Sequence, residues 1–204
     1  MRNEPWINFR LMARFICVTV CYNFAIMQSE PYRFSIEEYE HLAEMWCENE
    51  RFELLNGEIY TKPHVGPAHS FSVARLAEQF ILLSEHVAVM SRSPLQLPPD
   101  SETEPDIALL KLPKEQYRSR LPRGEDALLL VEVSKNTLEY DRTKKLPIYA
   151  RAAIPKVWIR NLVDNQLEVY RNPQGERYTS LTTYSEGQEV APLAFDNEPV
   201  QWWA

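Results

Sequence analysis

Residues 127–134 constrain the fold of this chain more than any other segment, because they read Ala-Leu-Leu-Leu-Val-Glu-Val-Ser. An almost unbroken apolar run of this length is typical of a strand that is buried on both faces of a sheet. Glu132 lies inside the run, and burying an ionised carboxylate costs free energy unless another group compensates its charge. We therefore expect a compensating group beside Glu132.

Asp106 is a second carboxylate in a similar setting. It follows Pro105 and precedes an apolar run, so we predict a single strand over 103–110 that carries it. A divalent cation prefers clustered carboxylate oxygens and would compensate both side chains. The pattern therefore predicts a metal between Asp106 and Glu132, with a lysine from the basic segment 141–145 beside it. The alternative is that Asp106 only caps a strand.

Helical spacing of apolar residues predicts three long helices, over 35–47, from 66 to about 85, and over 138–152. Ser35 and Glu38 form a capping box at the start of the first helix. Phe80 and Ile81 belong to the apolar stripe of the second. Pro147 should bend the third helix or mark a boundary within it.

The remaining apolar runs predict strands and one hairpin. Asn56-Gly57 between two alternating runs is a strong signal of a hairpin with a type I′ turn. A short helix is expected around 114–120, and further strands over 87–91, 95–97, 156–160, 166–171 and 178–184. Elements in this order make an α/β domain with a mixed central β-sheet flanked by helices.

Composition limits the classes of function. The chain has 204 residues, a net charge of −7, 45% hydrophobic and 25% charged residues, which predicts one ordinary globular domain, with or without a tail. An acidic domain is a poor electrostatic match for nucleic acid as a whole, which counts against a general DNA coat. It does not exclude a nuclease, whose site must be acidic to hold metal.

The three cysteines, Cys17, Cys21 and Cys47, are too few and too far from histidines to indicate a disulfide framework or a zinc site. We expect free thiols and therefore a cytoplasmic protein. Residues 1–26 combine arginines with an apolar run that is too short to span a bilayer. Three interpretations stay open for them: an extension upstream of a true start at Met27, a targeting segment, or a helix. We divide the chain into an N-terminal extension, 1–30, and a domain, 31–204.

The ordered set of segments over 32–171 resembles the PD-(D/E)XK nuclease superfamily, and more closely the restriction endonuclease family often called Uma-two. No single segment is specific, but the order is. The matching segments are Arg51–Glu58, His69, Glu104–Ile107, Leu130–Ser134, Asp141–Tyr149 and Ile154–Ile159. The resemblance implies a restriction-endonuclease-like core and a metal-dependent endonuclease that hydrolyses phosphodiester bonds in DNA.

The same resemblance implies roles for individual residues. Asp106, Glu132 and the carbonyl of Val133 would hold Mg²⁺ or Mn²⁺, and Glu53 would complete the site or orient water. The chain departs from the superfamily pattern at Ser134, which stands where a lysine is usual. The matching lysine is Lys145 in the following helix. A homodimer is also expected by resemblance, and no membrane partner.

Alternatives remain for several of these residues. Glu53 could instead pair with Arg51, and Lys145 could form an ordinary surface ion pair with Asp141, four residues earlier. His69 is interpreted as a half-buried histidine and Tyr149 as a packing residue. The basic stretch 111–123 either touches phosphates or is a solvated loop. At the level of the whole protein, the alternative is a catalytically inactive nuclease-fold module that binds nucleic acid or another partner.

Overall fold

The computed structural model describes residues 30–45, 51–192 and 199–203. Its contacts divide the chain into 1–32 and 33–204, and all the elements below belong to the second unit. The predictions for residues 1–29, with Cys17 and Cys21, and for Cys47 lie outside the described residues. The division into an extension and a domain stays a prediction.

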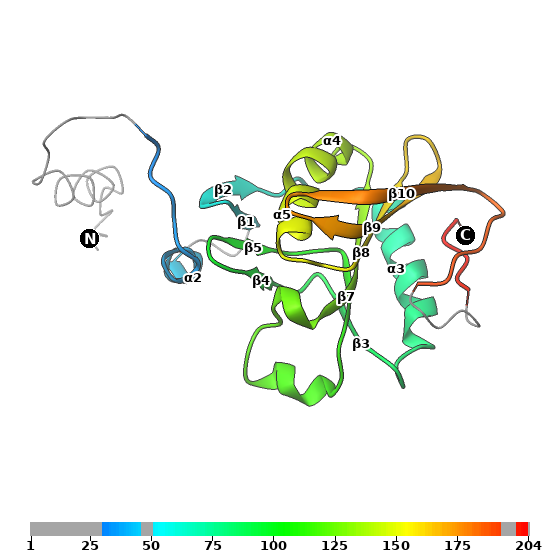
Figure 1. Cartoon of the computed structure of the whole chain (residues 1–204), viewed down its shortest axis with the longest axis horizontal. Helices are drawn as coiled ribbons and strands as arrows, with labels where there is room; N and C mark the ends of the chain where they lie inside the picture. Colours follow the sequence, from blue (N-terminus) through cyan, green and yellow to red (C-terminus); the bar gives the residue numbers. More distant parts are fainter. Residues whose placement is uncertain (1–29, 46–50, 193–198, 204) are drawn as a thin grey trace, which may run out of the picture. The chain divides into compact units, whose positions relative to one another are not determined.

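Two sheets and a few helices make up the described fold (Figure 1). The helices are α2 (Ile36–Met45), α3 (Pro67–Ile81), α4 (Leu138–Tyr140) and α5 (Leu146–Arg151), with 3-10 turns η1 (Lys114–Arg118) and η2 (Gly124–Asp126) and a π turn η3 (Asp141–Lys145). The strands are β1 (Phe52–Leu55), β2 (Glu58–Thr61), β3 (Ala88–Ser91), β4 (Leu95–Leu97), β5 (Ser101–Thr103), β6 (Ile107–Leu110), β7 (Ala127–Ser134), β8 (Lys156–Asn161), β9 (Gln166–Gln174) and β10 (Arg177–Ser185).

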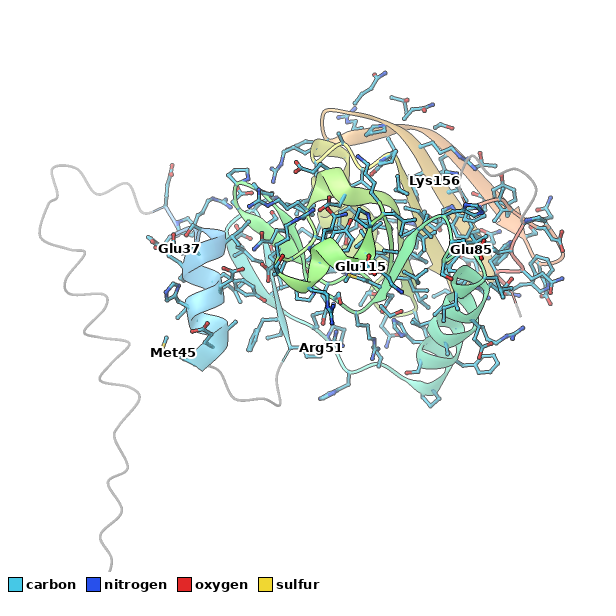
Figure 2. The ribbon with its side chains drawn as sticks, turned by 90° about the horizontal axis from the view of Figure 1, so that it is seen from below. Glu37, Met45, Arg51, Glu85, Glu115 and Lys156 are labelled. Atoms are coloured by element: carbon cyan, nitrogen blue, oxygen red, sulfur yellow. The ribbon has the colours of Figure 1, made fainter. Side chains whose placement is uncertain are left out.

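The larger sheet has the strand order β10-β9-β8-β7-β6-β3. Strands β7 and β8 run parallel, whereas the other neighbours run antiparallel, which confirms the predicted mixed sheet. On one face, Val131 and Val133 of β7 pack in a cluster with Phe80 of α3. On the other, Leu130 packs with Ile148 of α5. Figure 2 shows α3 along the strands, with Glu85 beyond its C-terminal end. The apolar run of β7 is thus covered on both faces.

The smaller sheet has the order β2-β1-β5-β4 and was not separated from the central sheet in the prediction. Its first two strands form the predicted hairpin, with Asn56 at φ 51° and Gly57 at φ 76°. Two successive positive φ angles are those of a type I′ turn. In Figure 2, Arg51 marks where the chain enters this hairpin. The predicted capping box of α2 is also present, since the Glu38 amide donates to the Ser35 hydroxyl and the Ser35 amide donates to the Glu38 carboxylate.

The prediction of one strand over 103–110 is wrong. The chain leaves the smaller sheet after Thr103 and enters the larger sheet at Ile107, so Glu104, Pro105 and Asp106 connect two sheets. Pro105 has no amide hydrogen to donate to a strand neighbour, which explains why the ladder stops there. This break places Asp106 at the junction of the two sheets.

Two predicted helices also differ from the structure. The segment over 138–152 is helical but contains the π turn η3, which ends two residues before Pro147. Helix α3 ends at Ile81 and is followed by turns, and Ile81 itself is 57% exposed, so it does not belong to the buried stripe. Trp158 and Trp202 are buried in the core, the latter near the C-terminal end of the described chain.

Candidate active site

Glu132 and Lys145 meet because β7 and α5 lie face to face. Side chains alternate along a strand, so Glu132 shares the α5 side of the sheet with Leu130. The Lys145 ammonium lies 3.1 Å from Glu132 Oε1, and the Tyr149 hydroxyl donates to the same oxygen at 2.5 Å. The expected compensating group beside Glu132 is therefore a lysine and a tyrosine of the following helix.

Glu53 reaches the same lysine from the smaller sheet. Its Oε2 atom lies 3.2 Å from Lys145 Nζ, and the Tyr140 hydroxyl donates to its Oε1 at 2.8 Å. Arg51 pairs with Glu104 instead, so the alternative pairing of Glu53 with Arg51 is wrong. Lys145 thus contacts carboxylates from both sheets.

Asp106 joins the site from the junction between the sheets. Its Oδ2 accepts a hydrogen bond from the Val133 amide at 2.9 Å and lies 3.1 Å from His69 Nε2. The Ser134 carbonyl accepts from Leu162, beyond the end of β8. Since successive residues of a strand direct their backbone groups to opposite sides, the Val133 carbonyl faces the Asp106 side.

Burial governs the titration of this cluster. Asp106 is 9% exposed, and Glu53, Glu132, Asp141 and Lys145 are 2–4% exposed. Burial raises the pKa of Glu132 to about 8; Lys145 opposes the shift, and Asp141 and Asp106 add to it. Burial acts to lower the pKa of Lys145, but Glu132, Glu53 and the other neighbouring groups outweigh it and raise that pKa well above its ordinary value.

The other two predicted carboxylates shift the opposite way. Burial acts to raise the pKa of Glu53, but Lys145, Lys62 and the hydrogen bond from Tyr140 outweigh it and hold that pKa below its ordinary value. For Asp106, burial is outweighed by His69 and by the Val133 amide, and its pKa is also lowered. The site therefore combines a charged amine with carboxylates of unequal acidity, of which Glu132 takes up a proton more readily than Glu53 or Asp106.

These side chains line one cavity of about 510 Å³. Its wall includes all four carboxylates, Lys145, the segment 62–69 at the start of α3, and the segment 135–137 after β7. Lys62 also lines the cavity; its amine donates to the Glu104 carbonyl at 2.6 Å and lies 3.9 Å from Glu53. A substrate group that enters this cavity would meet the carboxylates and the amine together.

The oxygen donors of the site are of the kind that a divalent cation prefers. Four carboxylates line the cavity, and the cations beside them are Lys145, Lys62 at 3.9 Å from Glu53 and Arg92 at 3.9 Å from Asp106, so ionisation of all four carboxylates would leave a net negative charge. Oxygen ligands and excess negative charge are what Mg²⁺ and Mn²⁺ prefer. Across residues 30–45, 51–192 and 199–203, no group of three or more His, Cys, Asp and Glu side chains is arranged to hold a metal. Asp106 and Glu132 supply two such side chains, so a cation between them would need the Val133 carbonyl and water as further ligands.

The structure thus brings together Glu53, Asp106, Glu132, Val133 and Lys145, the five residues singled out from the sequence. The alternative of a surface ion pair for Lys145 is wrong, because both Lys145 and Asp141 are buried, 3.9 Å apart. Ser134 does not face solvent either; its hydroxyl donates to Asp141 at 2.7 Å.

The sequence predicted no role in the site for Tyr140 or Tyr149. It favoured the interpretation of His69 as a half-buried histidine. Tyr149 does pack in the core, but its hydroxyl also reaches Glu132. Its position four residues after Lys145, which is itself four after Asp141, was a signal that the three share one helix face. Tyr140 carried no such signal, because its partner is Glu53, 87 residues earlier.

The basic stretch 111–123 does not line the cavity. It precedes the start of β7, whereas Glu132 and Val133 lie five and six residues after Ala127 along this strand, about 17–20 Å at the usual rise per residue. Arg120 is bound by Asp126 at 2.6 and 3.0 Å. Contact between this stretch and phosphates stays a prediction.

Comparison with known proteins agrees with the fold. The chain is similar in structure to a protein described as a putative nuclease belonging to DUF820 from Anabaena variabilis, with a TM-score of 0.62 and 14% sequence identity, over 83% of this chain and 95% of that chain. This likeness confirms the predicted restriction-endonuclease-like fold. No curated protein matches the chain. In the described part of the chain, every helix is too short or too polar to cross a membrane.

A family model matches the larger part of the chain. The model, Uma2, carries the description "Putative restriction endonuclease" and matches residues 36–198. This range contains all five of the residues singled out from the sequence. The chain belongs to the Uma2 family.

Proposed function

We propose that this protein is a metal-dependent endonuclease that hydrolyses phosphodiester bonds in DNA. The observation that supports it best is the position of Lys145, whose ammonium lies 3.1 Å from Glu132 and 3.2 Å from Glu53 in a cavity that Asp106 also lines. A nuclease that lacks the usual lysine at position 134 needs another amine at this place, and Lys145 supplies one.

Asp106, Glu132 and the carbonyl of Val133 are the groups that would hold Mg²⁺ or Mn²⁺. When bound, the cation supplies a Lewis acid and offsets negative charge on the phosphate. Glu132 must give up its proton to become a ligand, since its pKa is about 8 without metal. We therefore expect metal binding to release a proton from the protein below pH 8.

The chain's own residues would orient the reacting groups. The amine of Lys145 stays charged at neutral pH because its pKa is raised, so it can donate to a phosphate oxygen or to the attacking water. Glu53 stays ionised because its pKa is lowered, so it can accept a hydrogen bond from that water. Tyr140, Tyr149 and His69 fix the three carboxylates by the hydrogen bonds given above, which preserves their orientation.

Plasmid nicking by the purified full chain, with Mg²⁺ or Mn²⁺ and with chelator, tests the proposal. Cleavage should need metal and should be lost in Glu132→Gln, Asp106→Asn and Lys145→Met. Asp126→Asn is a matched control, because Asp126 is also a buried carboxylate that binds a cationic side chain, outside the cavity. A matched RNA substrate tests the preference for DNA.

Calorimetry with the same cations separates binding from turnover. If the wild type binds metal through Glu132 but cleaves neither DNA nor RNA, the inactive-module alternative is favoured. If Lys145→Met cleaves as fast as wild type, the role given to that amine is wrong.

A further inference from the structure

The helical segment from Tyr140 to Tyr149 directs four side chains at one place. Tyr140 and Lys145 contact Glu53, Lys145 and Tyr149 contact Glu132, and Asp141 lies 3.9 Å from the Lys145 amine. Residues 142–144 between them are exposed. The segment therefore turns one face to the cavity and residues 142–144 to solvent, while Ile148 packs in the apolar cluster.

A regular α-helix would not give this arrangement. Successive residues turn by about 100°, so Tyr140 and Tyr149, nine positions apart in the sequence, would lie about 180° apart on opposite faces. The π turn η3 holds one more residue than an α turn and so turns the later part back by about 100°. Tyr140 and Tyr149 then differ by about 80°, and Lys145 lies between them.

Two residues favour a π turn at this point. Pro147 has no amide hydrogen to donate to the Thr143 carbonyl, and its ring crowds that carbonyl in an α-helix. The Leu146 amide donates instead to Asp141, five residues back. The Thr143 hydroxyl donates to the Glu139 carbonyl at 2.7 Å, so this carbonyl keeps a partner where the α pattern is interrupted.

We propose that Thr143 and Pro147 are positioning residues: they hold the π turn that sets the register in which Lys145 reaches Glu53 and Glu132. Neither residue lines the cavity, so each acts through Lys145. The proposal deepens the proposed nuclease function, and it rests on that function only where cleavage is the measurement.

The first test is a double variant, Thr143→Val with Pro147→Ala, which keeps the chain length and lets the segment run as an α-helix. With Tyr140 held at Glu53, Lys145 should then turn by about 100° away from the carboxylates. Its labelling by an amine-reactive ester, followed by mass spectrometry, should rise at least about tenfold, because it is 3% exposed in the native protein. Lys144 is exposed and serves as the internal control. Cleavage should fall by about 100-fold, mainly in kcat.

The second test removes the extra residue. Pro147→Ala with Thr143 deleted leaves Tyr140 and Tyr149 eight positions apart, which a regular α-helix places about 80° apart. This variant should fold, protect Lys145 and recover cleavage. If Thr143 and Pro147 only stabilised the fold, the deletion variant should not recover protection of Lys145 or cleavage, because the deletion is a further perturbation on top of the substitution. Circular dichroism and urea unfolding establish that each variant is folded.

The outcomes separate the two proposals. Labelling of Lys145 in the double variant with protection in the deletion variant supports the register proposal, even if the wild type cleaves nothing and the nuclease function fails. Protection in both variants overturns it. Labelling in both, or a deletion variant that does not fold, overturns it as well.

Discussion

The structure allows the loss of unfolding free energy to be worked out for the replacement of Lys145 by methionine. The side chain keeps its length and apolar stem but loses the charge that lies 3.1 Å from Glu132 and 3.2 Å from Glu53. At an effective dielectric constant of about 20, each contact corresponds to about 5 kcal/mol of attraction. The folded variant would not carry that full loss, because the carboxylates can take up protons instead.

Proton uptake limits the loss and makes it depend on pH. Glu132 already has a pKa of about 8, so near neutral pH Glu53 contributes most of the cost. Protonating a carboxylate whose ordinary pKa is 4.5 costs about 1.4 kcal/mol per pH unit above that value. The expected loss in unfolding free energy is therefore about 3 kcal/mol at pH 7 and under about 1 kcal/mol at pH 5.

The sign follows from the protons bound. In the variant the pKa of Glu53 is raised in the folded state above its unfolded value, so the folded state binds more protons. Its stability relative to wild type must then fall as the pH rises above 4.5. Urea unfolding followed by tryptophan fluorescence, with chelator, at pH 5, 6 and 7 measures this. Lys144→Met, at an exposed neighbour, should change stability by less than about 0.5 kcal/mol. A loss that does not vary with pH, or one below about 1 kcal/mol at pH 7, would refute the reasoning.

Three further changes test other parts of the structure. Burial and a neighbouring carboxylate raise the pKa of Glu102 from 4.5 to about 7. Because the folded state binds the extra proton, the unfolding free energy should fall by up to about 3 kcal/mol as the pH rises through this window. Glu102→Gln should remove this dependence on pH. Tyr149→Phe removes a hydrogen bond to Glu132 and should lower the unfolding free energy by about 1–3 kcal/mol in urea at pH 7. Gly57→Ala should cost more than Gly175→Ala in the same assay. Both glycines have positive φ angles, but only at Gly57 would the added Cβ lie 2.7 Å from another side-chain carbon, and the strain common to both is about 1–2 kcal/mol.

Strand β7 and the hairpin at Asn56-Gly57 were predictable because their signals are local. A continuous apolar run defines a covered strand without reference to the rest of the chain, and the turn residues define their own backbone angles. The pair Glu132 and Lys145 was found because a carboxylate in such a run needs a partner, and because the order of segments resembles a known family.

Other features depended on groups distant in sequence. The run over 103–110 looks like one strand, and only the pairing of its two halves with different neighbours shows that the chain changes sheets. The contact of Tyr140 with Glu53 follows from how the sheets meet, which no spacing within either segment reports. The π turn lies in a segment with a good helical pattern, and Pro147 predicted a bend there without specifying its kind.

The position of Asp106 between two sheets has a consequence for how the protein acquires activity. Glu53 belongs to the smaller sheet and Glu132 to the larger, and Lys145 contacts both. With only the larger sheet formed, Glu132 and Lys145 can meet, but Glu53 is missing from the cluster. Glu53 joins the carboxylates and the amine only when the sheets dock, so we expect the proposed site to be completed late in folding. In a refolding experiment, we expect cleavage to return with the slowest structural phase, whereas helical signal returns earlier.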